Sequence, residues 1–203
     1  MRDFGNTSRR EFLLGLLATI VFAQWGRSTT AARAQTESKP PTPECPDAGD
    51  VTPRSTAGPF YSPDSPLRTS LLEPGIKGTP VALTGYVLTT DCKPVRNALL
   101  DFWHADDDGE YDNVGYKLRG HQFTDENGRY RLETIVPGVY PGRTRHYHVR
   151  VQAPDQRVLT TQLYFPNEPG NARDGIFRPE LVMHVNDVGD AKEASFNFVL
   201  ALA

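Results

Sequence analysis

Short segments rich in β-branched and aromatic residues recur along the chain and are separated by turns. Such residues favour strands, and no helix-length stretch with a 3.6-residue apolar period follows residue 34. The Asp-Glu-Asn-Gly sequence at 125–128 predicts a hairpin turn between two strands. The pattern therefore predicts an all-β fold, a single and mostly antiparallel β-sandwich with long loops. The predicted strands are 81–89, 98–104, 121–124, 130–135, 146–152, 158–164 and 194–202.

The N-terminal residues have the three-part pattern of a secretory signal. A polar start is followed by an apolar run at 12–23, too short to span a membrane, and by Ala-Arg-Ala at 32–34, small residues at the −3 and −1 positions of a cleavage site. The paired arginines at 9 and 10, followed by Phe-Leu, resemble a twin-arginine signal; a Sec signal or a membrane anchor is the alternative. We expect a signal peptide at 1–34, a flexible Pro-rich segment at 35–50 and one domain at 51–203. The protein is then exported, periplasmic or secreted, with no membrane contact after cleavage.

Charge and cysteine content narrow the function classes. The 203 residues include 22 Lys+Arg and 25 Asp+Glu, a net charge of −3. Removing the signal takes away five Arg, one Asp and one Glu, which leaves 17 basic and 23 acidic residues. This balance provides no basic stripe, so we expect no nucleic-acid partner. Cys45 and Cys92 permit one disulfide in an exported protein, which we favour over two free thiols.

Two histidines mark a candidate metal site. His146 and His148 are two residues apart in a predicted strand, so their side chains point to the same face. Imidazole suits zinc, copper, iron or nickel, so the pair alone does not choose the metal. Tyr140 and Tyr111 lie in Gly-containing or Pro-containing turns nearby, and phenolate is a hard donor suited to trivalent iron. Tyr116 is a rival for the first tyrosine position.

The chain resembles the intradiol ring-cleavage dioxygenases, which include the protocatechuate and catechol dioxygenases. The order and spacing of several short motifs between residues 56 and 162 carry the resemblance. These motifs are Thr-Ala-Gly-Pro-Phe-Tyr (56–61), Phe-Trp-His-Ala-Asp (102–106), Asp-Gly-Glu-Tyr (108–111), Leu-Arg-Gly (118–120), Thr-Asp-Glu-Asn-Gly-Arg-Tyr (124–130), Val-Pro-Gly-Val-Tyr-Pro (136–141), Arg-Thr-Arg-His-Tyr-His (143–148) and Thr-Thr-Gln (160–162).

The resemblance implies one non-haem Fe(III) per chain, a small aromatic diol substrate and O2, with a cis,cis-muconate-type product. The implied metal ligands are Tyr111, Tyr140, His146 and His148. Arg143, Gln162 and Tyr140 fall on catalytic positions of the family, and Thr56, Gly58 and Pro59 match a segment that lines the substrate site. Such enzymes serve the catabolism of aromatic compounds.

Some residues depart from the family pattern. Gly142 replaces the usual tryptophan after the Tyr-Pro step, and the approach to the histidines reads Arg-Thr-Arg-His (143–146) instead of Arg-Pro-Ala-His. These changes leave the metal set intact, but they leave the identity of the catechol substrate open. Whether the chain forms a homo-oligomer is also open. A non-enzymatic secreted β-sandwich binding module and a zinc-dependent hydrolase that uses the His-x-His pair are the alternative functions.

Overall fold

The structure is a computed structural model, and it describes residues 50–202. The predicted signal peptide, nearly all of the Pro-rich segment, and Cys45 lie outside these residues, so the export signal and the Cys45–Cys92 disulfide stay predictions. No helix in the described part of the chain is long and apolar enough to cross a bilayer.

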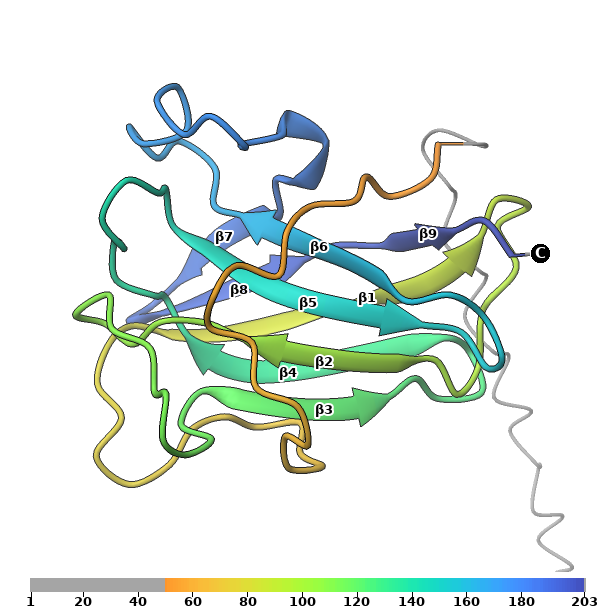
Figure 1. The fold of residues 1–203 in the computed structure, drawn as a ribbon, viewed down its shortest axis with the longest axis horizontal. Helices are drawn as coiled ribbons and strands as arrows, with labels where there is room; N and C mark the ends of the chain where they lie inside the picture. Colours follow the sequence, from red (N-terminus) through yellow and green to blue (C-terminus); the bar gives the residue numbers. More distant parts are fainter. Residues whose placement is uncertain (1–49, 203) are drawn as a thin grey trace, which may run out of the picture. The chain divides into compact units, whose positions relative to one another are not determined.

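Two sheets pack face to face as a β-sandwich, which confirms the predicted fold class (Figure 1). The first sheet has the strand order β3-β2-β5-β6, and all its pairs are antiparallel. The second has the order β4-β1-β8-β7, with β9 also paired to β1. The elements are β1 (Pro80–Thr89), β2 (Leu99–Trp103), β3 (Arg119–Phe123), β4 (Arg129–Ile135), β5 (His146–Gln152), β6 (Leu159–Tyr164), the 3-10 helix η1 (Pro179–Leu181), β7 (His184–Val188), β8 (Ala191–Ser195) and β9 (Phe198–Leu200).

The core between the sheets is built from alternate residues of the strands. In β5, Tyr147, Val149 and Val151 face this core and are fully buried. Leu83 of β1 and Leu132 of β4 meet them from the second sheet, also with no exposed area. Burying apolar area in this way is the main stabilising contribution of the fold.

The predicted hairpin at 125–128 is wrong in its pairing. The tight turn exists, since the amide of Gly128 donates to Asp125 O at 3.0 Å. However, β3 before it pairs with β2, whereas β4 after it pairs with β1 in the other sheet. The turn residues determine only the local reversal, and the pairing of the two strands depends on distant segments of the chain.

The predicted strand at 194–202 is two strands, and a further strand was missed. An ideal Cβ on Gly85 of β1 would lie 1.7 Å from Phe196 O, so the chain bulges toward β1 between β8 and β9. At this break in the backbone hydrogen bonds with β1, the side chain of Asn197 supplies an acceptor: its Oδ1 accepts from the amide of Tyr86 at 3.1 Å. The missed strand β7 is a largely exposed edge strand with polar residues, which leaves no apolar pattern to detect.

Four segments that carry the candidate site gather at one end of the sandwich. The loops after β2 and β4 and the start of β5 lie at the left of Figure 1, and the loop after β6 rises above them at the top. The N-terminal segment from residue 52 to 70 crosses the outer face of the first sheet. Backbone bonds from Ser55 N to Thr160 O and from Arg68 N to His121 O, both 2.9 Å, hold it there.

Candidate metal centre and active site

The histidine pair on β5 has the geometry of two ligands of one ion. His146 and His148 are both buried, and their Nε2 atoms are 3.1 Å apart. Two nitrogens about 2.1 Å from one metal lie about 3 Å apart when they subtend a right angle. The Nδ1 of His146 donates to Thr144 O at 2.6 Å, so its Nε2 lone pair points toward His148. Such a backbone partner on the far nitrogen is the usual arrangement of a metal-binding histidine.

Neighbouring strands fix the plane of the His148 ring. Trp103 of β2 and Gln162 of β6 are its cross-strand partners. The Trp103 indole stacks on the imidazole with a centroid distance of 4.9 Å and an angle of 5°. Gln162, fully buried, donates to Thr56 O at 3.0 Å and lies 3.4 Å from His148 Nδ1. The outer face of this sheet is thus a rigid platform for the imidazole.

Two loops that interlock at glycines bring the tyrosines together. An ideal Cβ on Gly109 would lie 2.5 Å from Val139 O, and one on Gly138 would lie 2.2 Å from Gly109 N. No larger residue allows this approach of the two backbones. The Gly138 amide also donates to Asp106 O at 2.6 Å.

Tyr111 consequently lies next to the histidine pair, and Tyr140 lies edge-on to Tyr111. Their ring centroids are 6.0 Å apart, and the Tyr111 ring is 6.1 Å from that of His148. Phe60 stacks on Tyr111 at 4.4 Å and meets Tyr140 edge-on at 5.4 Å. Contacts thus connect the four residues expected as ligands in the order His146, His148, Tyr111 and Tyr140.

The electrostatics suit a cation at this position. Burial lowers the pKa of His146 to about 4 and that of His148 well below its usual value, so both imidazoles are neutral at pH 7. Burial raises the pKa of Tyr111 well above its usual value, although the charges of Arg143 and Arg119 oppose this rise. A buried phenol with a raised pKa ionises when a metal cation replaces its proton.

The donor set selects among metals. Within residues 50–202 no group of three His, Cys, Asp or Glu side chains is arranged to hold a metal ion. The tyrosines next to the histidine pair are the further candidate donors that the family resemblance implies. Hard phenolate oxygens combined with imidazoles fit a trivalent iron ion, so these residues are compatible with the implied Fe(III).

The Arg143 side chain lies between two loops next to this cluster. Its Nη2 donates to Gln162 Oε1 at 2.6 Å and its Nε to Asp174 Oδ2 at 2.8 Å. The hydroxyl of Tyr164 also donates to Gln162 Oε1, at 2.8 Å. Burial alone would raise the pKa of Asp174, but bonds from backbone amides and from Arg143 outweigh it and lower the pKa. Arg143 is thus a held cation directly beside the ligand cluster.

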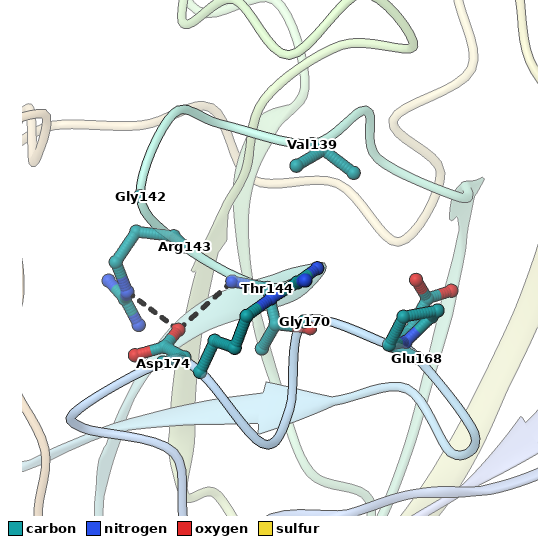
Figure 2. A pocket seen from close by; sticks show the side chains of 9 residues that line it. Val139, Gly142, Arg143, Thr144, Glu168, Gly170 and Asp174 are labelled. Atoms are coloured by element: carbon teal, nitrogen blue, oxygen red, sulfur yellow. Dashed lines mark hydrogen bonds and ion pairs between the residues drawn. The ribbon is translucent and has the colours of Figure 1, made fainter.

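The three residues expected to line the substrate site lie beside it. Thr56 accepts the Gln162 hydrogen bond through its carbonyl, and an ideal Cβ on Gly58 would be 3.3 Å from His148 Cε1. Pro59 is exposed and precedes Phe60. Gly142 has a φ of +80° and open space around its Cβ position. It lines a pocket of roughly 500 Å³ that also includes Arg143 and Asp174 (Figure 2).

Tyr116, the rival for the first tyrosine position, and the three remaining histidines lie outside the candidate site. The hydroxyl of Tyr116 donates to Pro63 O at 3.1 Å, and the side chain is 38% exposed, so it does not join the cluster. His104 is buried and bonded to Ala105 O and Thr134 Oγ1. His121 is bonded to Ser65 O, and His184 is exposed on β7. These three histidines are structural or surface residues.

Sequence reasoning missed several residues that hold the site. Trp103 follows the core residue Phe102 in an apolar strand, so its side chain points to the opposite face. That it packs on His148 could be known only from the pairing register of β2 with β5. The side chain of Arg119 is fully buried, and its guanidinium donates to Phe60 O at 2.6 Å and to Asp112 O at 2.7 Å. It thus holds the residue that stacks on Tyr111 and the residue that follows Tyr111 in sequence. Asp174 lies in a loop without any local signal.

Comparison with known proteins gives concordant matches. A family described as Dioxygenase matches residues 56–202. The dioxygenase domain of a dioxygenase carbohydrate-binding protein fusion from Streptomyces sp. SirexAA-E is 53% identical, with a TM-score of 0.74, over 76% of this chain and 100% of that one. Chlorocatechol 1,2-dioxygenase from Rhodococcus opacus is 29% identical over 75% of this chain and 73% of its own length.

Other relatives are longer than this chain. Hydroxyquinol 1,2-dioxygenase from Nocardioides simplex is 31% identical over 64% of this chain and 52% of its own length. The chain thus spans about half the length of this relative.

Proposed function

Because the chain belongs to the intradiol ring-cleavage dioxygenase family, we propose that it opens the ring of a catechol-type substrate with O2. The bond between the two hydroxylated carbons is broken, and the product is of the cis,cis-muconate type. Both atoms of O2 enter the product, and the substrate supplies all the electrons, so the reaction needs no external reductant.

One observation carries the proposal: two neutral imidazoles and two phenols converge from β5 and two interlocked loops. The Nε2 atoms of His146 and His148 are 3.1 Å apart, and Tyr111 and Tyr140 lie beside them. In this proposal these four residues hold one Fe(III) per chain. When bound, the ferric ion supplies a Lewis-acid site for a catecholate and promotes its reaction with O2.

The residues of the chain have distinct roles in this reaction. As a phenolate ligand, Tyr140 would accept a proton at its Oη from the incoming catechol, while Tyr111 stays stacked on Phe60. The Arg143 guanidinium stabilises negative charge that develops on the substrate. Gln162 orients that guanidinium through its Oε1, and the segment at 56–59 borders the bound ring. Trp103 and Phe60 exclude water from the ligand cluster.

The alternative functions are not favoured. A binding module leaves the convergence of two tyrosines and two histidines unexplained. A zinc hydrolase needs a third His, Cys or carboxylate ligand, and none joins the histidine pair within residues 50–202.

The test is an oxygen-uptake screen of the iron-loaded protein over catechol, protocatechuate, hydroxyquinol and gallate, with products identified by mass and ultraviolet spectrum. We expect uptake of one O2 per ring and a dicarboxylate product with at least one of these substrates. His148→Ala is the control and shows no uptake. Ring opening beside the diol, or no uptake by protein containing iron, contradicts the proposal.

We also propose export through the twin-arginine route, which carries folded proteins and so suits an enzyme that takes up its metal before export. The paired arginines at 9 and 10 support this. Arg9→Lys with Arg10→Lys keeps the charge and is expected to leave the precursor in the cytoplasm. Normal export of this double variant contradicts the assignment.

A further inference from the structure

Asp174 is a buried carboxylate in the loop between β6 and η1. Its side chain is only 2% exposed. An ionised carboxylate at such a position is costly unless its oxygens are fully bonded. The bonds that Asp174 makes therefore indicate what the loop is built to hold.

Both carboxylate oxygens are used. Oδ2 accepts from Arg143 Nε at 2.8 Å and from the amide of Thr144 at 3.0 Å, and Oδ1 accepts from the amide of Ile176 at 3.1 Å. Figure 2 shows the first two of these bonds as dashed lines converging on one oxygen. The amide of Asp174 itself donates to Gly170 O at 3.0 Å. The carboxylate is thus fixed by its own loop and by residues 143 and 144, just before β5.

The loop that carries Asp174 is fastened closely to residue 144. The Thr144 hydroxyl donates to Asn171 Oδ1 at 2.7 Å. An ideal Cβ on Gly170 would lie 2.9 Å from Thr144 Oγ1, so a larger residue there would push the loop away. Asp174 therefore cannot move away from Arg143 without breaking several contacts.

This arrangement defines the direction of the Arg143 guanidinium. Asp174 accepts the Nε hydrogen and Gln162 accepts a hydrogen of Nη2, so bonds at two nitrogens hold the planar group. Arginine otherwise has many rotamers, and ordering them costs conformational entropy. A cation that is ordered before the substrate binds stabilises developing charge without reorganisation.

We propose that Asp174 is a positioning residue for the ring-cleavage reaction, which orients Arg143 through its Nε while Gln162 orients it through Nη2. This inference rests on the proposed function. The hydrogen bonds of the Asp174 carboxylate go to Arg143, Thr144 and Ile176 and not to the four residues proposed as iron ligands, so its main effect is expected on the reaction step.

The first test is the kinetics of Asp174→Asn, which keeps the size of the side chain and removes its charge. We expect kcat to fall by about 10- to 100-fold, as is typical for partners that orient an active-site group, while KM changes little. Iron content and the visible spectrum of the resting protein stay as in the unmodified chain. Asp125→Asn is the matched control, because Asp125 also accepts two backbone amides but lies in the turn between β3 and β4. It is expected to leave kcat unchanged.

The second test is a double-mutant cycle with Arg143→Ala. If Asp174 acts through Arg143, then Asp174→Asn has little further effect on kcat once Arg143 is absent. The same cycle is measured by urea unfolding of the metal-free full-length chain, where the two losses of stability are expected to be less than additive. Additive effects in either cycle, or iron loss that parallels the loss of kcat, overturn the inference. Absence of ring cleavage by the unmodified chain overturns the proposed function, and the unfolding cycle then still tests the Arg143–Asp174 coupling.

Discussion

The two sheets of the sandwich share one core but differ on their outer faces. The outer face of β3-β2-β5-β6 is polar and yet buried, and it bears Asp101, Arg119, His146, His148 and Gln162. The strands β4, β1, β8 and β7 have mostly exposed or half-exposed outer residues, such as Thr84 and Arg131. The difference arises from the segment at 52–70, which crosses the outer face of the first sheet, while its two ends bond to the edge strands β9 and β4 of the second sheet.

The candidate site lies on the sheet whose polar outer face is buried. A buried polar face destabilises a fold unless each group finds a partner, so it persists only where it is held by a network or serves a function. The network on the first sheet is nearly complete, and it holds two neutral histidines with their free nitrogens facing one another. The second sheet supplies apolar cover and stability.

The largest effect is expected on the first sheet. His146→Ala or His148→Ala should lose iron and all measurable ring cleavage but keep the sandwich, because the core lies on the opposite face of β5. Metal analysis, oxygen uptake and circular dichroism check these three outcomes. Global unfolding of both variants would mean that the histidines are structural.

The converse change lies in the second sheet. Leu83→Ala in β1 removes a fully buried side chain and is expected to cost about 2–5 kcal/mol in the free energy of unfolding. Iron content and kcat at 25 °C should stay near those of the unmodified chain, since Leu83 contacts none of the ligands. Urea unfolding and metal analysis measure both. Loss of iron without loss of stability in Leu83→Ala would contradict the assignment of iron binding to the first sheet and of stability to the second.

A third change concerns the junction of the sheets at His104. This residue follows β2 and bonds to Thr134 of β4 at 2.6 Å, and burial lowers its pKa from 6.5 to about 4. Because the folded pKa is below the unfolded one, its contribution is complete above pH 6.5 and is lost as the pH falls toward 4. The free energy of unfolding is expected to fall by about 3 kcal/mol in total when His104 becomes fully protonated in the folded protein.

Urea unfolding of the metal-free chain at pH 7 and pH 5 tests this effect. Stability should fall less between these values in His104→Gln than in the unmodified chain. Equal falls in both proteins would assign the acid sensitivity to other groups.

The sequence-based prediction was strongest where residue type and strand pattern act together. Seven segments were expected as strands, and six of them correspond to β1 through β6. The alternation of His146 with Tyr147 placed the histidines on one face. Long-range contacts were beyond this reasoning: the pairing of β3 with β2, the break at Phe196 over Gly85, and the edge strand β7 depend on distant backbone.

The same limit applies to the site. The family resemblance implied Tyr111, Tyr140, His146 and His148 as ligands, which stays a prediction, and contacts in the structure connect the four. Asp174 and Arg119 act through bonds to residues 31 and 59 positions away, and local sequence contains no trace of such bonds.

The smallest effect is expected at Gly142, in the loop that ends at the first sheet. Gly142→Trp restores the bulk usual in the family, and Gly142→Ala is the control, because both must adopt the positive φ of +80° that disfavours side chains. Relative to Gly142→Ala, the tryptophan variant should lower kcat/KM for bulky catechols against catechol by a factor on the order of ten. An unchanged ratio means that position 142 does not border the substrate.

The central claim is that two tyrosines and two histidines hold a ferric ion. Metal analysis combined with the visible spectrum of the purified mature protein tests it most directly, because a ferric phenolate absorbs visible light and a zinc site does not. We expect one iron per chain, a red to burgundy colour, and a weakened visible band in both Tyr111→Phe and Tyr140→Phe. Zinc alone, with no visible band even after reconstitution with iron, would contradict the account.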